Sequence, residues 1–168
     1  MPTSKHLIDV FLQPGDWFVA DEDYQLRTIL GSCVSITLWH PPSRIGGMSH
    51  FLLPNRPTFG AEPVHMPELD ARYGDEALQL IFEQLAAAGV AGAECEAKIF
   101  GGGNMFPAYI RGDAINVGQR NGDAARQMLR HLNIPVVSEC LFGVGHRQVI
   151  FDVSRGDVWS CQIEPSQV

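Results

Sequence analysis

Apolar and polar residues alternate most clearly where Val34, Ile36 and Leu38 are separated by more polar side chains. This period of two predicts a strand over residues 34–39, which the prolines that follow would end. A second strand is predicted over residues 45–53. Four more strands are predicted around residues 97–100, 136–141, 149–153 and 158–163. The last two should form a hairpin, because the SRGD segment between them is typical of a turn.

Two other segments repeat their apolar residues with the period of a helix. The first is predicted to begin at Asp75, where two acidic residues favour a helix N-terminus, and to end at Gly89. The second is predicted to have Asn121 as its cap and to end before Asn133. The residues that the two helices are expected to bury are Leu78, Ile81, Phe82, Leu85, Ala125, Met128, Leu129 and Leu132.

Two amphipathic helices and about six strands predict an α/β (α+β) fold. We expect a layered sandwich of mixed, largely antiparallel β-sheet covered by the two main helices. No repeat or shift in composition marks a boundary, so residues 1–168 are expected to form one domain. The proline-rich segment 54–74 is long for a connection inside a compact domain, which is typical of a functional or disordered loop.

The charge of the chain argues against some classes of binding partner. The formal net charge is −7, the pI is near 5.2 and the 12 Lys and Arg residues are scattered, so neither nucleic acid nor an anionic membrane surface is expected to bind. No apolar run approaches the roughly 20 residues of a membrane span. The first ten residues, which include Asp9, lack a signal-peptide cleavage pattern. We therefore expect a cytoplasmic protein without membrane insertion.

One cysteine and one histidine are candidates for chemistry. Gly31 and Ser32 place Cys33 after a turn and at the head of a strand, where a thiol can be accessible. The period of the strand over 45–53 puts Met48, His50 and Leu52 on one face. If the two strands pair as a hairpin, His50 approaches Cys33, and a thiol needs such a base to become nucleophilic. The alternative is that Cys33 is a small buried hydrophobe and His50 a hydrogen-bonded core residue.

The remaining cysteines and the glycine run suggest structural roles. Cys95, Cys140 and Cys161 follow no comparable turn and form no CxxC pair, so we expect neither a zinc site nor disulfides. Cys161 alternates with neighbouring apolar residues as a core residue would. The GGGN segment at 101–104 lacks the Lys-Ser/Thr of a phosphate-binding loop, so a tight, backbone-close turn is the better interpretation.

Longer segments carry a family resemblance. The sequences TILGSCV at 28–34 and IGGMSHFLLP at 45–54 resemble the chemoreceptor glutamine deamidase family, CheD. Later motifs of that family are similar to RYGD at 72–75, KIFGGGNMF at 98–106 and VGQRN at 117–121. Five such segments in the family's order favour a catalytic Cys33.

The resemblance implies a single catalytic domain that hydrolyses selected glutamine side chains on the cytoplasmic helices of methyl-accepting chemotaxis receptors. The products are glutamate and ammonia, and some members also hydrolyse methyl esters. It implies that Cys33 is the nucleophile, that His50 is the general base and that Thr28 orients His50. No cofactor or metal is implied.

Two other functions stay open. The same resemblance allows a non-catalytic chemotaxis adaptor that binds receptors or a CheC-type phosphatase. A thiol amidase with some other protein target is also compatible, because a cysteine and a histidine do not encode their substrate.

Overall fold

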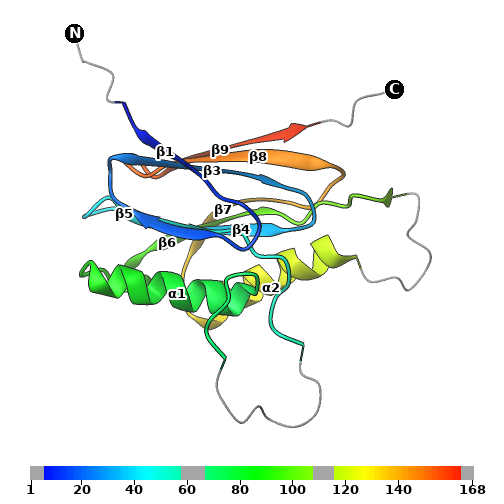
Figure 1. The fold of residues 1–168 in the computed structure, drawn as a ribbon, viewed down its shortest axis with the longest axis horizontal. Helices are drawn as coiled ribbons and strands as arrows, with labels where there is room; N and C mark the ends of the chain where they lie inside the picture. The colour runs from blue at the N-terminus through cyan, green and yellow to red at the C-terminus, as the bar shows by residue number, and fades with distance from the viewer. Residues whose placement is uncertain (1–5, 58–66, 108–115, 164–168) are drawn as a thin grey trace.

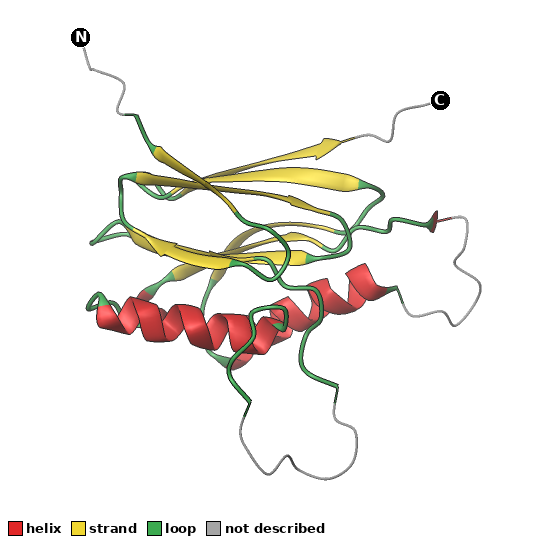
Figure 2. Cartoon of the chain, viewed as in Figure 1, coloured by secondary structure: helices red, strands yellow, loops and turns green. Residues whose placement is uncertain are grey.

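The computed structural model describes residues 6–57, 67–107 and 116–163, and these residues form three stacked layers (Figures 1 and 2). One layer is a four-stranded sheet in the order β1-β3-β8-β9. The middle layer is a five-stranded sheet in the order β2-β5-β4-β6-β7. Helices α1 and α2 both cover the outer face of this second sheet. The predicted layered α+β fold with two main helices is therefore confirmed.

Each sheet combines antiparallel pairs with one parallel pair. The four-stranded sheet contains β1 (Ile8–Phe11), β3 (Tyr24–Leu30), β8 (His146–Asp152) and β9 (Asp157–Ile163). The five-stranded sheet contains β2 (Trp17–Ala20), β5 (Ile45–Ser49), β4 (Val34–His40), β6 (Glu96–Gly101) and β7 (Val136–Leu141). Only β1–β3 and β6–β7 are parallel among the strand pairs of the described residues. The predicted hairpin of the last two strands is confirmed, with β8 and β9 antiparallel.

The two helices differ in how well the sequence located their ends. Helix α1 (Gly74–Ala87) begins one residue before the predicted Asp75, and Gly89 follows its end with φ of 80°, a left-handed conformation that suits glycine. Helix α2 (Val117–His131) begins four residues before the predicted cap. Its cap is Asn116, whose side chain accepts a hydrogen bond from the Gln119 N–H, so the prediction that Asn121 caps this helix is wrong. A short 3₁₀ turn, η1 (Gly92–Glu94), precedes β6.

Two apolar layers hold the three structural layers together. The helix-side layer lies between the helices and the five-stranded sheet, and it includes Leu78, Leu85, Ile36 and Leu129. The inter-sheet layer lies between the two sheets, and it includes Leu12, Leu26, Leu30, Met48 and Phe151. Complete burial of this many large side chains is the main stabilising contribution to such a fold.

The first three strands were missed by the sequence analysis. β1 and β2 have only four residues each, which is too short for a clear alternation. β3 buries Leu26, Thr28 and Leu30 on one face, so a polar residue interrupts its inward row. The segments 54–57 and 67–73 carry no regular helix or strand, while residues 58–66 of the predicted long loop lie outside the described part of the chain.

The strand predicted over 45–53 is shorter in the structure, because β5 ends at Ser49. The hydroxyl of Ser49 accepts the N–H of Ile36 at 3.1 Å, a hydrogen bond that a strand carbonyl would otherwise accept. The backbone of His50 then bonds to the turn between β1 and β2. Its N–H donates to the Asp16 carbonyl at 3.1 Å, and its carbonyl accepts the Gly15 N–H at 2.8 Å. The pairing with β4 is therefore interrupted at Ser49 and His50, and it resumes in the same register at Phe51, which pairs with Val34.

Candidate active site

Thr28 and His50 meet in the inter-sheet layer. β3 turns Thr28 inward between Leu26 and Leu30, and the Thr28 side chain is fully buried. Its Oγ1 lies 2.8 Å from the Leu12 carbonyl, to which it donates, and 2.7 Å from Nδ1 of His50. A threonine hydroxyl has one proton. Since that proton is donated to Leu12, Nδ1 of His50 must donate to Thr28, which leaves Nε2 as an unprotonated acceptor.

The imidazole of His50 is held in its neutral form. His50 is only 2% exposed. Burial lowers the pKa of His50 to about 4, although the nearby Asp16 charge and the Leu12 carbonyl act in the opposite direction. At neutral pH the ring is therefore an uncharged base, and its burial in an apolar setting agrees with the sequence analysis.

Cys33 ends a turn, residues 31–33, in which every carbonyl group accepts a hydrogen bond. The turn joins β3 to β4, and Cys33 itself is half-buried. The Gly31 carbonyl accepts the Gly103 N–H at 2.8 Å, and the Cys33 carbonyl accepts the Gly102 N–H at 2.9 Å. The intervening Ser32 carbonyl accepts from Nδ2 of Asn121 at 3.0 Å. Burial raises the pKa of the Cys33 thiol, so the sulfur is protonated at neutral pH.

The glycine run 101–103 allows its backbone to approach the backbone of the cysteine turn closely. Gly101 and Gly102 have φ of 111° and 66°, which is the left-handed region that favours glycine. A Cβ on Gly101 would clash with the Cys33 carbonyl oxygen, and a Cβ on Gly103 would stand 2.6 Å from the Gly145 oxygen. The predicted backbone-close turn is confirmed, and the backbone that it approaches is the cysteine turn.

The Cys33 and His50 segments pair directly. Val34 and Phe51 exchange two backbone hydrogen bonds of 3.1 and 3.0 Å, and both side chains pack in the helix-side layer. Cys33 and His50 each come one residue earlier, so both point to the opposite side of their segments, toward the four-stranded sheet. In agreement with this, Cys33 packs against the inter-sheet layer and His50 bonds to Thr28. The hairpin pairing that the sequence suggested is confirmed, and it puts the thiol and the imidazole on one side.

The other cysteines lie in different settings. Cys95 is 2% exposed and burial raises its pKa to about 11, as expected of a structural residue. Cys140 and Cys161 are exposed. The prediction that Cys161 is a core residue is wrong: its neighbours Trp159 and Ile163 are 53% and 45% exposed on the uncovered face of β9. Their alternation reflects a sheet face that no described layer covers.

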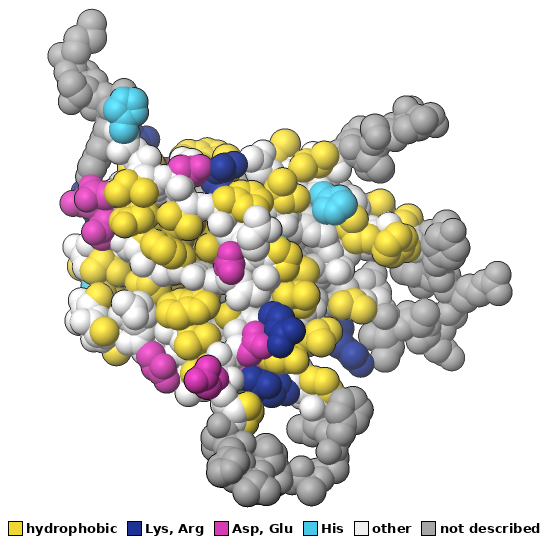
Figure 3. Space-filling view, viewed as in Figure 1, with side chains coloured by type: hydrophobic (Ala, Val, Ile, Leu, Met, Phe, Trp, Pro, Cys, Tyr) yellow, Lys and Arg dark blue, Asp and Glu magenta, His cyan; other side chains and the backbone are white. Residues whose placement is uncertain are grey.

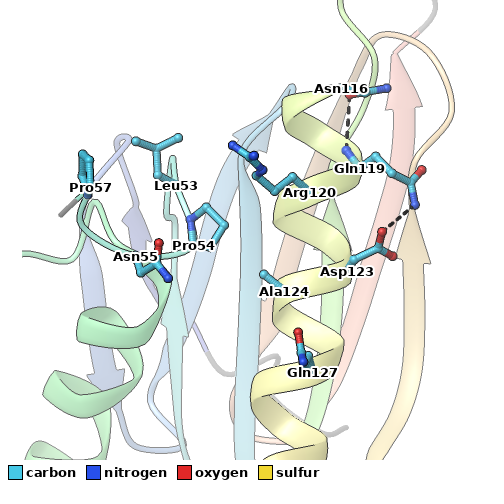
Figure 4. A pocket seen from close by; sticks show the side chains of 10 residues that line it. All are labelled: Leu53, Pro54, Asn55, Pro57, Asn116, Gln119, Arg120, Asp123, Ala124 and Gln127. Atoms are coloured by element: carbon cyan, nitrogen blue, oxygen red, sulfur yellow. Dashed lines mark hydrogen bonds between the residues drawn. The ribbon is translucent and has the colours of Figure 1, made fainter. Parts of the chain in front are cut away.

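Two surface hollows flank the N-terminal end of α2. One hollow, of about 270 Å³, is lined by Ser32, Met105, Phe106 and Val117, so it opens beside the cysteine turn. The other, of about 860 Å³, lies between residues 53–57 and the exposed side of α2, and both polar and apolar side chains line it (Figure 4). Asn116 lines both. Elsewhere on the face shown in Figure 3, acidic and basic side chains are interspersed with apolar ones.

Sequence reasoning missed three contributions to the site. It did not place the β1–β2 turn, which anchors His50 through Gly15 and Asp16. It did not connect the glycine run to Cys33. It also assigned Asn121 to a helix cap, whereas the structure buries this residue inside α2. The available signal was the spacing of Asn121, four and eight residues before the buried Ala125 and Leu129 on one helix face.

The site combines a thiol in a turn held by hydrogen bonds, a neutral imidazole on the same side and a threonine bonded to that imidazole. On a layered α+β scaffold, this combination defines a candidate cysteine hydrolase. Residues 52–162 match the model of the family described as CheD chemotactic sensory transduction, which is well over half of the chain. The chain belongs to the CheD family.

Relatives extend the match to nearly the whole chain. The chain is 62% identical over 165 residues to the "Probable chemoreceptor glutamine deamidase CheD 2" of Albidiferax ferrireducens, which covers 98% of this chain and 93% of the relative. It is 42% identical over 158 residues to "Probable chemoreceptor glutamine deamidase CheD 3" of Dechloromonas aromatica, covering 94% and 88%. It is 40% identical over 159 residues to "Probable chemoreceptor glutamine deamidase CheD 1" of Chromobacterium violaceum, covering 95% and 80%.

Among the described residues, neither α1 nor α2 has the length and apolar character that crossing a membrane requires. Within the same part of the chain, no three His, Cys, Asp or Glu side chains are grouped so that they could hold a metal ion.

Proposed function

We propose that this chain is a single catalytic domain that converts glutamine side chains of chemotaxis receptors to glutamate and releases ammonia. Membership of the CheD family and the names of its relatives support the substrate class. The observation that carries the chemistry is the 2.7 Å contact between Thr28 Oγ1 and His50 Nδ1, because it leaves Nε2 of a neutral imidazole free to act as a base.

In the proposed reaction Cys33 is the nucleophile, His50 is the general base and Thr28 orients His50. As the sulfur bonds to the amide carbon, Nε2 of His50 takes the thiol proton. His50 then gives this proton to the nitrogen as the C–N bond breaks, so ammonia leaves and a thioester remains. Water attacks the thioester while His50 accepts one water proton, and that proton returns to the sulfur when the glutamate product leaves.

Backbone N–H groups supply the stabilisation of the oxyanion in this proposal. Within the described part of the chain, neither Ser32 N–H nor Cys33 N–H has a hydrogen-bond partner. Both belong to peptide units whose carbonyls are already held, so they are fixed donors beside the sulfur. Donors fixed in advance stabilise developing negative charge without reorganisation. The reaction as written needs no metal or cofactor.

The proposed partners are the cytoplasmic domains of methyl-accepting chemotaxis receptors, which puts the protein in the cytoplasm. Each reaction adds one negative charge to a receptor helix and so changes the repulsion between neighbouring helices. A methyl ester at the same site has a similar acyl carbon and is a second proposed substrate. A CheC-type phosphatase is the second proposed protein partner.

Ammonia release from a purified receptor cytoplasmic fragment tests the proposal. Wild type should release ammonia, Cys33→Ala should release none above background, and Cys161→Ala should match wild type because its thiol is exposed far along β9. Equal release by wild type and Cys33→Ala would overturn the assignment of the nucleophile.

Measurements in cells separate the two other functions. An adaptor without turnover would keep its chemotaxis phenotype in the Cys33→Ala variant. A thiol amidase with a different target would leave receptor glutamines unchanged, so that mass spectra of receptors from cells with and without the gene would be the same.

A further inference from the structure

Asn121 is a polar residue on the buried face of α2. The other buried residues of this helix are Gly118, Gly122, Ala125 and Leu129, all without a polar side chain. The side chain of Asn121 is fully buried, and its Oδ1 has no hydrogen-bond partner among the described residues. An unpaired buried amide oxygen destabilises a fold. The asparagine therefore carries an energetic cost at Oδ1, which directs attention to the bonds made by its amide nitrogen.

The amide nitrogen of Asn121 joins the two segments of the site. Nδ2 donates to the Ser32 carbonyl at 3.0 Å and to the Leu52 carbonyl at 2.8 Å. Ser32 directly precedes Cys33, and Leu52 comes two residues after His50. One NH₂ group thus uses both of its protons to tie the nucleophile's segment to the base's segment.

The bond to Ser32 also fixes the direction of a donor. In a trans peptide the carbonyl and the N–H point in opposite directions. The carbonyl of the Ser32–Cys33 peptide points at Asn121, so its N–H, which belongs to Cys33, points away from α2. The peptides on either side are held by Gly103 and Gly102, which leaves the turn little freedom to rotate.

We propose that Asn121 is a positioning residue: it orients the Cys33 N–H toward the substrate oxyanion and holds the cysteine and histidine segments in register. This inference rests on the proposed function and adds a residue to it. Only a side-chain NH₂ supplies two donors at this reach. Aspartate offers none when ionised, serine offers one on a shorter stem, and leucine fills a similar volume with none.

The test compares Asn121→Leu and Asn121→Ser with Leu129→Ala, a variant of the same helix face that creates a cavity without touching the site. For each protein we would measure kcat and KM for ammonia release from the receptor fragment. The free energy of unfolding and the rate at which iodoacetamide alkylates Cys33 would be measured on the same samples. Mass mapping of the Cys33 peptide separates this thiol from the exposed ones.

Both Asn121 variants should lose about tenfold to a hundredfold in kcat, with KM within about twofold, because orientation is lost and substrate contacts are not. Their Cys33 alkylation rate should also change, whereas Leu129→Ala should keep wild-type kcat and alkylation at an equal or larger loss of stability. If the Asn121 variants keep wild-type kcat, or lose activity only in proportion to stability, the inference is wrong. If wild type itself releases no ammonia, the proposed function fails instead, and a changed alkylation rate still reports on the positioning of the thiol.

If Asn121→Leu fails to fold, Asn121→Ser tests the positioning role instead, because the smaller side chain leaves the helix face unstrained. A Ser variant that folds and keeps both kcat and alkylation would contradict the positioning role.

Discussion

The helix-side layer and the inter-sheet layer use the same five-stranded sheet in different ways. On the helix side, α1 and α2 bury small and aliphatic residues, and Asn121 is the one polar residue among those buried in these two helices. On the other side, Thr28 and His50 lie buried among Leu26, Leu30 and Met48. One layer is an ordinary apolar core, while the other accommodates a base with a strongly lowered pKa.

The difference teaches that both faces of the sheet contribute apolar burial, whereas the proposed base lies on one face only. Asn121 reaches the Gly31–Cys33 turn from the helix side, and Thr28 holds His50 from the four-stranded sheet. Substitutions of aliphatic residues in the helix-side layer should therefore affect mainly stability, and substitutions of Thr28 or His50 should affect mainly catalysis. Each prediction below tests that separation.

The largest effect is expected for His50→Gln, which removes the base from the inter-sheet layer and keeps a polar side chain of similar size. Loss of general acid–base catalysis should lower kcat by roughly a thousandfold. The control is His131→Gln, which changes an exposed histidine of α2 and should leave kcat unchanged. A loss of less than about tenfold in His50→Gln would show that another group takes the thiol proton.

Leu85→Ala tests the helix-side layer. Leu85 is fully buried in α1, so truncation should lower the free energy of unfolding by about 3 kcal/mol through lost burial and a residual cavity. Denaturant unfolding followed by circular dichroism measures this change. At temperatures where the variant is folded, kcat should equal that of wild type, and a large loss of kcat would contradict the separation of the two layers.

Thr28→Val should have a smaller effect on catalysis. Valine keeps the shape of threonine but removes the acceptor for Nδ1–H, so the imidazole can adopt the wrong tautomer or orientation. We expect kcat to fall by about tenfold to a hundredfold with little change in KM. Stability should change by only about 1 kcal/mol for the lost bond to Leu12.

Thr37→Val is the matched control, because Thr37 is a buried threonine of β4 with no side-chain bond to His50. Nitrogen chemical shifts of the His50 ring should report a changed tautomer in Thr28→Val alone. Equal kcat for both variants would remove Thr28 from the proposed mechanism.

The fold could be predicted from sequence where one physical signal dominates. α1 follows from a regular apolar spacing that ends at a glycine, and β4 follows from clean alternation over Val34–His40. β3 could not be found in this way, because its inward row includes Thr28 and its outward row includes Ile29, which is 43% exposed. A strand that contributes a polar group to a site loses part of the pattern that would identify it.

The candidate site could be predicted from the sequence only in part, for a similar reason. A turn and a strand period made Cys33 and His50 candidates, and a hairpin pairing was the condition for their approach, whereas their catalytic roles and Thr28 came only from a family resemblance. Asn121 was misplaced because asparagine is favoured at helix caps, and local preference cannot reveal bonds to Ser32 and Leu52, which lie 89 and 69 residues away in the chain.

The smallest effect concerns the acid side of the pH profile. A histidine of ordinary pKa near 6.5 would be only about one-tenth neutral at pH 5.5, whereas a pKa of about 4 keeps His50 almost wholly neutral there. Because the neutral form is the base, kcat/KM should fall by less than about twofold between pH 7 and 5.5, provided that the receptor fragment stays folded.

The lowered pKa of His50 makes the stability of the fold, unlike its activity, sensitive to acid. From about pH 6.5 down to about 4 the unfolded chain binds a proton that folded His50 does not, so wild type should lose stability on acidification more steeply than His50→Gln. A rate that halves near pH 6.5, together with equal acid sensitivity of the two proteins, would mean that the inter-sheet layer does not hold His50 neutral and that its difference from the helix-side layer is one of shape alone.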